Sequence, residues 1–260
     1  MNDFLLSIQE QPWILIMAGA IIGYLLGSIS TARLVYFMAT GSTKYEPFAE
    51  VIPHTDEKFE SDLISATWVT KKLGKRYGCI TSILDMLKVA LPTLLFKLLF
   101  TSQPYFLLVA ITGIAGHNYP VYHRFKGGRG ESPIIGTILV INWFGYFIAN
   151  AAASILGYIT GSILVLRWGA YVLLIFWFWI YFNNIYYIIF MVLANFFFWF
   201  SMRNDLKTFQ ELKKSKGLKF SEEDVSDFIL MGKSMGRFMD KYGLYFVIKR
   251  LFSNNNITDK

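Results

Sequence analysis

The sequence predicts an all-α integral membrane protein with seven transmembrane helices, its N-terminus outside the cell and its C-terminus in the cytoplasm. Composition is the first reason. Of the 260 residues, 54% are hydrophobic and only 17% are charged, whereas soluble domains carry about 25% charged residues. Patterning is the second reason, because the apolar residues gather in runs that approach or exceed the ~20 residues needed to cross a bilayer as a helix.

The distribution of positive charge predicts the orientation. The formal net charge is +7, but the cations gather in Lys44–Arg76, in Arg124–Arg129 and in the segment after Met202. The turns that alternate with these regions carry none. Cytoplasmic loops of membrane proteins are enriched in Lys and Arg, so the pattern indicates a cytoplasmic face. We therefore expect no nucleic-acid partner.

The first apolar run, Trp13–Met38, is long enough to span the membrane. It contains Gly23, Gly27, Ser28 and Ser30, and small residues of this kind let neighbouring helices approach closely. A polar loop, residues 40–76, separates this run from the next.

The second run, Tyr77–Phe100, carries charged residues inside an apolar segment. Asp85 and Lys88 are three residues apart, so they share one helix face and can pair. Ionisable groups within a span usually face the interior of the helix bundle. The pair is expected either to hold helices together or to support a binding site.

Five further predicted spans complete the bundle, and the first of them ends in a basic, glycine-rich loop. Pro133 favours a helix start after that loop, so the next span is short. The five are approximately Pro104–Val121, Ser132–Ile141, Trp143–Leu156, Ile163–Tyr181 and Ile185–Phe200.

The chain divides by composition into a seven-span domain, residues 1–202, and a basic cytoplasmic tail, residues 203–260. Apolar residues recur at helical spacing between Val225 and Tyr242. A helix of this kind typically lies on the anionic inner leaflet. The single cysteine, Cys79, cannot form an internal disulfide and is expected to be a small buried hydrophobe.

The loop after the third span is the strongest candidate for chemistry. Between Arg124 and Gly130 it holds three glycines and three cations. Glycines allow positive φ and let the backbone turn its N–H groups toward one point. With Lys126 and Arg129 added, that point predicts an anion site, most simply for phosphate. The alternative is that these cations only fix the topology.

Other membrane-enzyme chemistries lack their residues. The chain has no Gly-x-Ser-x-Gly elbow, no Walker or dinucleotide glycine pattern, no histidine pair with metal-ligand spacing and no His-x4-Asp motif. We therefore expect no metal and no cofactor. Phosphate binding at the inner membrane face remains, and it suffices for group transfer if the substrate arrives already activated.

Several motifs resemble those of the bacterial acyl-phosphate:glycerol-3-phosphate acyltransferases, seven-span enzymes that make lysophosphatidic acid. The loop Gly116–Gly130 is similar to that family's G-H-x-x-P-V-F-x-x-F-K-G-G-K-G. The resemblance runs from Tyr24 to Phe209. The other matching stretches are Gly23–Ile29, Leu73–Gly78 and Leu84–Pro92.

The resemblance implies acyl transfer from acyl phosphate to the sn-1 hydroxyl of glycerol 3-phosphate. The enzyme would be a multi-pass protein of a bacterial cytoplasmic membrane, with its active site facing the cytoplasm and membrane lipids around it. No acyl-enzyme is needed, because phosphate is a good leaving group. The protein's task is to hold two anionic head groups together and to stabilise developing charge.

Site residues follow from the resemblance, position by position. The catalytic candidates are Ser61, Lys71, Arg129 and Asp205. Ser162, with Thr160 as its alternative, would add a hydroxyl for the acyl phosphate. The remaining substrate-binding candidates are Thr67, His117, Asn118, Lys126, Gly127, Gly128, Gly130 and Arg203. Roles without a substrate contact are also possible: Thr67 as a helix cap, Lys71 as a solvated cation, and His117 and Asn118 as residues that brace the loop.

The sequence departs from the family at several of these positions. The family's G-S-G-N-x-G-A-T-N corresponds to Glu60–Trp68, which keeps Ser61, Ala66 and Thr67. The family's H-R-E-N-I begins with Met202 here and has Asp205 in place of asparagine. Two alternatives therefore stand beside the enzyme: a member that binds acyl phosphate or lipid without transfer, and one that acylates a different small acceptor.

Overall fold

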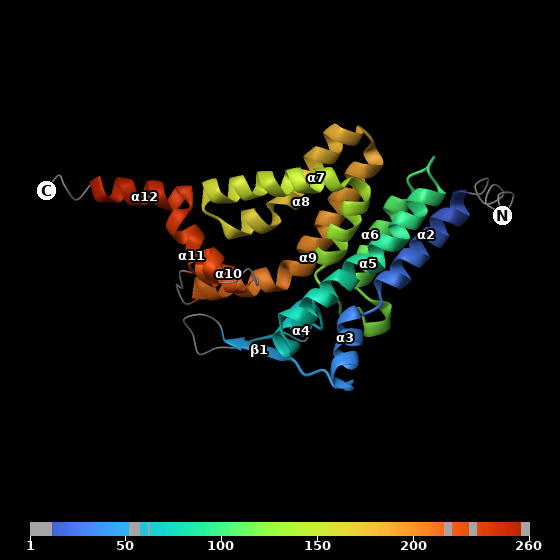
Figure 1. The fold of residues 1–260 in the computed structure, drawn as a ribbon, viewed down its shortest axis with the longest axis horizontal. Coiled ribbons are helices and arrows are strands. Elements are labelled where there is room, and N and C mark those ends of the chain that lie inside the picture. Colours follow the sequence, from blue (N-terminus) through green and yellow to red (C-terminus); the bar gives the residue numbers. More distant parts are fainter. Residues whose placement is uncertain (1–11, 52–57, 62, 216–219, 229–232, 256–260) are drawn as a thin grey trace. The chain divides into compact units, whose positions relative to one another are not determined.

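The computed structural model describes residues 12–51, 58–61, 63–215, 220–228 and 233–255 (Figure 1). It divides into two compact units. The first holds α2 to α6, the beginning of α7 and the first part of α9. The second holds the rest of α7, nearly all of α8, the end of α9 and the tail helices α10 to α12. Each unit is described by itself.

The first predicted span is two helices rather than one. Helix α2 (Pro12–Gly27) ends before a three-residue break, and α3 (Thr31–Thr40) follows it. Ser30 caps α3, because its side chain accepts a hydrogen bond from the Arg33 N–H at 3.4 Å. The run of small residues is therefore also the place where the helix stops.

Small residues let α2 pack directly on α6 (Tyr105–Asn118), as the sequence predicted. A Cβ atom on Gly27 would collide with the backbone oxygen of Gly113, and one on Gly116 would collide with that of Tyr24. The two backbones thus touch, which only glycine permits. This contact holds the break after α2 beside the end of α6, where the glycine-rich loop begins.

The segment between the first two predicted spans adds a short β-hairpin, which the sequence did not predict, to a described chain that is otherwise helical. Strands β1 (Phe48–Val51) and β2 (Lys58–Ser61) form a two-stranded sheet. Helix α4 (Ala66–Leu73) follows. Trp68 fixes α4 in place, because it is buried among aromatic and aliphatic side chains of α3 and its neighbours.

Helix α5 (Lys75–Leu99) matches the second predicted span. After α6 and the short turn η1 (Val121–His123), α7 (Glu131–Thr160) covers both of the next two predicted spans. Its backbone is non-helical at Asn142, with φ −156° and ψ 82°. The sequence predicted a boundary between two spans in this region. The helix breaks one residue after the expected end of the shorter span, Ser132–Ile141.

Helices α8 (Ile163–Phe182) and α9 (Ile185–Ser215) match the last two predicted spans, and α9 continues past Met202 without a break. The tail forms α10 (Glu222–Phe228), α11 (Lys233–Tyr242) and α12 (Leu244–Asn255). The start of α8 is tied to the tail, because the Ile163 N–H donates to the Glu222 carboxylate at 2.7 Å.

Five helical segments of the described chain are long and apolar enough to cross a membrane. They are Pro12–Thr40, Lys75–Leu99, Glu131–Thr160, Ile163–Phe182 and Ile185–Arg203. One expectation about α5 was wrong: Cys79 is exposed rather than buried. Its side chain lies on the outward face of the first turns of the helix.

Candidate functional site

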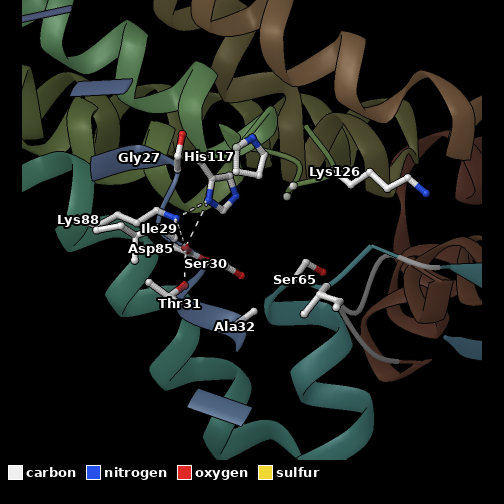
Figure 2. Close-up of a pocket in the computed structure, with 15 residues that line it drawn as sticks. Gly27, Ile29, Ser30, Thr31, Ala32, Ser65, Asp85, Lys88, His117 and Lys126 are labelled. Carbon is white, nitrogen blue, oxygen red and sulfur yellow. Dashed lines mark hydrogen bonds and ion pairs between the residues drawn. The ribbon is translucent and has the colours of Figure 1, made fainter. Parts of the chain in front are cut away.

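A small open pocket lies in the first unit where three elements meet: the break after α2, the middle of α5 and the glycine-rich loop (Figure 2). Its polar lining comes from serine and threonine hydroxyls at the break and from a buried charged cluster. The lining includes Ser28, Ser30, Thr31, Ser65, Asp85, Lys88, His117, Pro120, Lys126, Gly127 and Gly128.

The charged cluster is centred on Asp85. Its Oδ1 accepts a hydrogen bond from the Thr31 hydroxyl at 2.6 Å. The same oxygen forms a salt bridge with Lys88 Nζ at 2.8 Å. The predicted pairing of Asp85 with Lys88 is thus confirmed. Lys88 Nζ also donates to the Ile29 carbonyl at 2.7 Å and lies 2.9 Å from His117 Nδ1. One ammonium therefore joins the helix break, α5 and the end of α6.

The glycine-rich loop closes tightly over His117. Gly128 N–H donates to the His117 carbonyl at 3.1 Å. A Cβ on Gly128 would collide with His117 Nε2, and one on Gly127 would collide with the His117 carbonyl oxygen. These two glycines are thus required by close approach.

Positive φ in this loop occurs at other residues than expected. Gly130 adopts it, with φ 81°, but Gly127 and Gly128 do not. Arg124 and Phe125 do so instead, at φ 54° and 59°. Since the Gly128 N–H bonds to the chain itself, it is not free to hold an anion as the sequence suggested.

Asn118 braces the loop, which was one of its two predicted roles. It is 3% exposed, and its Nδ2 donates to the Phe197 carbonyl at 3.1 Å and to the Ser201 hydroxyl at 2.9 Å. A Cβ on Gly130 would lie 2.6 Å from Asn118 Oδ1. Asn118 therefore links α6, the start of α7 and α9 within the first unit.

The structure brings some of the predicted site residues together. His117, Lys126, Gly127 and Gly128 line the pocket, although the Lys126 side chain extends away from the charged cluster in Figure 2. Arg129 is half-buried in the same loop but is not part of the lining.

Two further candidates lie on α4 outside the lining. Lys71 is exposed, and Thr67 is half-buried inside the helix. The cap of α4 is Ser65, whose Oγ accepts from the Trp68 N–H at 3.4 Å. The capping role suggested for Thr67 was therefore wrong by two residues.

The remaining candidates are not among the described residues that line the pocket. The side chains of Ser61 and Asp205 lie outside the described part of the chain. Thr160 and Ser162 belong to the second unit. Arg203 is exposed, with its guanidinium 3.5 Å from the centre of the Phe200 ring, and its neighbour Met202 is 2% exposed.

Sequence reasoning assigned no site role to four hydroxyl residues that line the pocket: Ser28, Ser30, Thr31 and Ser65. Thr31 is held by Asp85, and Ser65 stands where the family pattern has a glycine. The signal that could have found Ser65 was its position before an apolar helix, where serine is a favoured cap. Nothing in the sequence linked Thr31 to Asp85.

His123, in the turn before the glycine-rich loop, contributes little positive charge near neutral pH. Partial burial lowers the pKa of His123, and the positive charges of Arg33 and Lys88 lower it further. The imidazole is therefore mostly neutral at pH 7, because its ordinary pKa of about 6.5 already lies below that pH. The charge beside this pocket comes from lysine and arginine.

Comparisons of the sequence and of the structure with known proteins both find glycerol-3-phosphate acyltransferases. The sequence model of a family described as Glycerol-3-phosphate acyltransferase matches residues 17–211. A glycerol-3-phosphate acyltransferase of Mycoplasma mycoides subsp. mycoides is 28% identical over 213 residues, which are 72% of this chain and 77% of that protein. One from Legionella pneumophila is 32% identical over 123 residues, which are 47% of this chain and 40% of that protein.

A solved structure shares the fold. It is the glycerol 3-phosphate form of PlsY (YgiH), described as an integral membrane glycerol 3-phosphate acyltransferase. The TM-score is 0.58 at 20% sequence identity, over 75% of this chain and 92% of that one. The likeness shows that the chain has the fold of an integral membrane protein.

Proposed function

The chain belongs to the glycerol-3-phosphate acyltransferase family, and we propose that it transfers a fatty acyl group from acyl phosphate to the sn-1 hydroxyl of glycerol 3-phosphate. The product is lysophosphatidic acid, a precursor of membrane phospholipids. One observation carries the proposal. The pocket built from the α2 break, the Asp85–Lys88–His117 cluster and the glycine-rich loop lies entirely within the residues that match the family.

The proposed reaction is a direct displacement at an activated carbonyl. The glycerol hydroxyl oxygen forms a bond to the acyl carbon, the bond from that carbon to the phosphate oxygen breaks, and phosphate leaves with the electron pair. The hydroxyl proton passes to the phosphate oxygen or to water. The protein's contribution is to bring two anions together and to stabilise negative charge.

Within this scheme we assign the acyl-phosphate contacts to Ser61, Lys71, Arg129 and Ser162, and the glycerol 3-phosphate side to Arg203 and Asp205. Lys126 supplies positive charge, since it is exposed and belongs to the pocket lining. Gly127 and Gly128 shape the loop over His117. These roles rest on the motif positions and on the charge of the loop.

The proposed topology follows from the cations. We assign seven spans, with an outside N-terminus and the pocket facing the cytoplasm of a bacterium. The support is that Lys71, Lys126 and Arg129 lie in the cation-rich segments of the sequence. Residues 1–202 then form the acyltransferase domain and residues 203–260 a cytoplasmic tail on the membrane surface.

A second candidate function has its own support. Met202, which stands where the family has histidine, is 2% exposed, and Trp68, which replaces an asparagine, is 1% exposed. Neither buried apolar side chain is placed to donate a hydrogen bond to a substrate. A member that binds acyl phosphate or lipid without transfer, or that uses a different small acceptor, fits these two positions.

The first test is an assay of the purified protein in lipid with palmitoyl phosphate and glycerol 3-phosphate, following phosphate and lysophosphatidic acid together. We expect both products from the wild type and a loss of about 10²-fold or more in Arg129→Ala. The matched control is Lys249→Ala, which removes an exposed cation beyond the family match. Acyl-phosphate binding without product would favour the second candidate.

A further inference from the structure

The three N–H groups of the Lys88 ammonium are all in use. Nζ lies 2.8 Å from Asp85 Oδ1, 2.7 Å from the Ile29 carbonyl oxygen and 2.9 Å from His117 Nδ1. An ammonium has three donors and no acceptor. The atom facing it in each direction must therefore accept a hydrogen bond, and this includes Nδ1 of His117.

The alternative assignment places a proton on His117 Nδ1 and directs it to Asp85, whose Oδ1 is 3.3 Å away. That proton would point at the same region as a Lys88 N–H, with two donors only 2.9 Å apart. Asp85 Oδ1 is also already used, since it accepts from Thr31 at 2.6 Å and from Lys88 at 2.8 Å. The 2.9 Å contact of Nδ1 with Lys88 Nζ is shorter than its 3.3 Å contact with Asp85 Oδ1, so Nδ1 is assigned as the acceptor of a Lys88 N–H.

Charge balance agrees with this assignment. Lys88 and Asp85 form a neutral pair, and both are largely buried, with side chains 10% and 4% exposed. A doubly protonated imidazole would place a second cation 2.9 Å from the ammonium. Like charges this close in a poorly hydrated site repel strongly. His117 is therefore neutral, and its one proton is on Nε2.

The Nε2 atom faces the glycine-rich loop. It lies where a Cβ of Gly128 would be, and no residue in the described chain is its hydrogen-bond partner. His117 lines the pocket together with Ser65 and Lys126 (Figure 2). An N–H donor in a pocket that the Ser65 hydroxyl also lines suits an oxyanion.

We propose that Lys88 locks His117 in the tautomer that carries its proton on Nε2, making it a neutral hydrogen-bond donor to a phosphoryl oxygen bound in the pocket. This rests on the proposed function for the identity of the ligand, since both substrates carry phosphate. His117 then belongs to the binding residues, while Lys88 is a positioning residue that acts through it.

The tautomer is directly measurable by ¹⁵N NMR of histidine-labelled protein in lipid. The sequence has three histidines, so the double variant His54→Gln, His123→Gln leaves His117 as the sole signal. We expect an unprotonated Nδ1 and a protonated Nε2. Adding inorganic phosphate should shift the Nε2 resonance, and Lys88→Met should move the proton to Nδ1, where Asp85 becomes its acceptor. A protonated Nδ1 in the parent, or no response of Nε2 to phosphate, overturns the proposal.

The kinetic arm compares two substitutions of similar size. Gln has an amide N–H that reaches the position of Nε2, whereas Leu has no donor. We expect His117→Leu to raise the KM of one substrate about tenfold or more, and His117→Gln to recover most of it. The substrate whose KM rises, palmitoyl phosphate or glycerol 3-phosphate, identifies the source of the phosphoryl oxygen. Equal losses in both variants count against a donor role.

Failure of the proposed function is distinguishable from failure of this inference. If the wild type yields no lysophosphatidic acid, the acyl-transfer proposal fails, but the NMR experiment with inorganic phosphate still gives a definite answer on the tautomer and its ligand. If product forms and Nδ1 carries the proton, only the inference about Lys88 and His117 fails.

Discussion

Trp68 shows how a substituted motif position has become part of the packing. Its ring lies 4.8 Å from that of Tyr36, edge to face, and its Nε1 donates to the Glu46 carbonyl at 3.0 Å. With Tyr45 it forms an aromatic cluster that ties α4 to α3 and to the segment before β1. The family's asparagine could not fill this volume, so the change at residue 68 has a structural explanation.

Removing the Trp68 side chain is expected to destabilise the protein strongly. Trp68→Ala should lower the free energy of unfolding by about 3–5 kcal/mol, because it deletes a buried aromatic side chain and leaves a cavity. Trp13, which is 60% exposed, is the matched control. Denaturant titration in micelles measures both. A loss for Trp68→Ala no larger than that for Trp13→Ala would contradict this account of the cluster.

Some residue-level features of the site were readable from the sequence and others were not. The three-residue spacing of Asp85 and Lys88 predicted their ion pair, and the glycines predicted a tight loop. The contact of Thr31 with Asp85 joins residues 54 positions apart. It depends on how α3 packs on α5, which no local pattern reports. Ser65 was missed because the family pattern has glycine there.

At the scale of the helices, two lysines of α5 have the same structural role. Each donates to backbone carbonyl groups beside a break in a neighbouring helix. Lys88 donates to the Ile29 carbonyl between α2 and α3, and Lys97 donates to the Val140 and Ile141 carbonyls, at 2.6 and 3.3 Å, before the non-helical Asn142. Within a membrane such carbonyls are costly to leave unpaired. We therefore expect these lysines to stabilise the chain at both breaks.

Lys97 tests this carbonyl-binding role more directly than Lys88 does, because Lys97 does not line the pocket. Lys97→Met should lower the free energy of unfolding by about 1–3 kcal/mol, since the carbonyls before Asn142 lose their donor. Leu98→Met, at a position 67% exposed on the same helix, is the control. Both are followed by denaturant unfolding in micelles. Equal stability of the two variants would argue against a stabilising role of Lys97 at the break.

The helix breaks also mark the limit of prediction at this scale. Hydropathy located the apolar runs well, because each crossing needs an apolar length. It treated Trp13–Met38 as one span, since Ser28, Ile29 and Ser30 are compatible with a helix in composition. The break is favoured only once Ser30 caps α3 and Lys88 reaches Ile29, and both depend on tertiary contacts.

At the scale of the whole molecule, the tail helices belong to the second unit, where α10 and α11 pack on each other. Asp240 of α11 caps α10 by accepting from the Glu222 and Glu223 N–H groups, at 3.2 and 3.1 Å. A Cβ on Gly236 would collide with Glu223, so α10 and α11 pack closely. The sequence predicted an amphipathic helix here. The periodicity did not resolve the boundary at Gly243, which separates α11 from α12.

The link between the tail and α8 should respond to pH. Burial raises the pKa of Glu222; the hydrogen bond from Ile163 acts in the opposite direction, and the nearby charge of Asp240 raises it further. A raised folded-state pKa stabilises the protein fully below the unfolded value of about 4.3, and this stability is lost as the pH rises through the folded value. Glu222→Gln should therefore flatten the fall of stability above pH about 4.3.

The measurement is denaturant unfolding of the full chain at a series of pH values from acid to neutral. Glu211→Gln, an exposed carboxylate on α9, serves as the control and should keep the wild-type slope. If Glu222→Gln shows the same dependence as the wild type, the ionisation of Glu222 does not contribute to the stability of the tail.

The outward position of Cys79 has a practical consequence. It is the sole thiol in the chain and is exposed on the first turns of α5, the helix that carries Asp85 and Lys88. A maleimide dye or spin label would therefore attach at one known point of the natural protein. Spectroscopy of substrate-dependent motion in the pocket's central helix thus requires no cysteine to be removed or introduced.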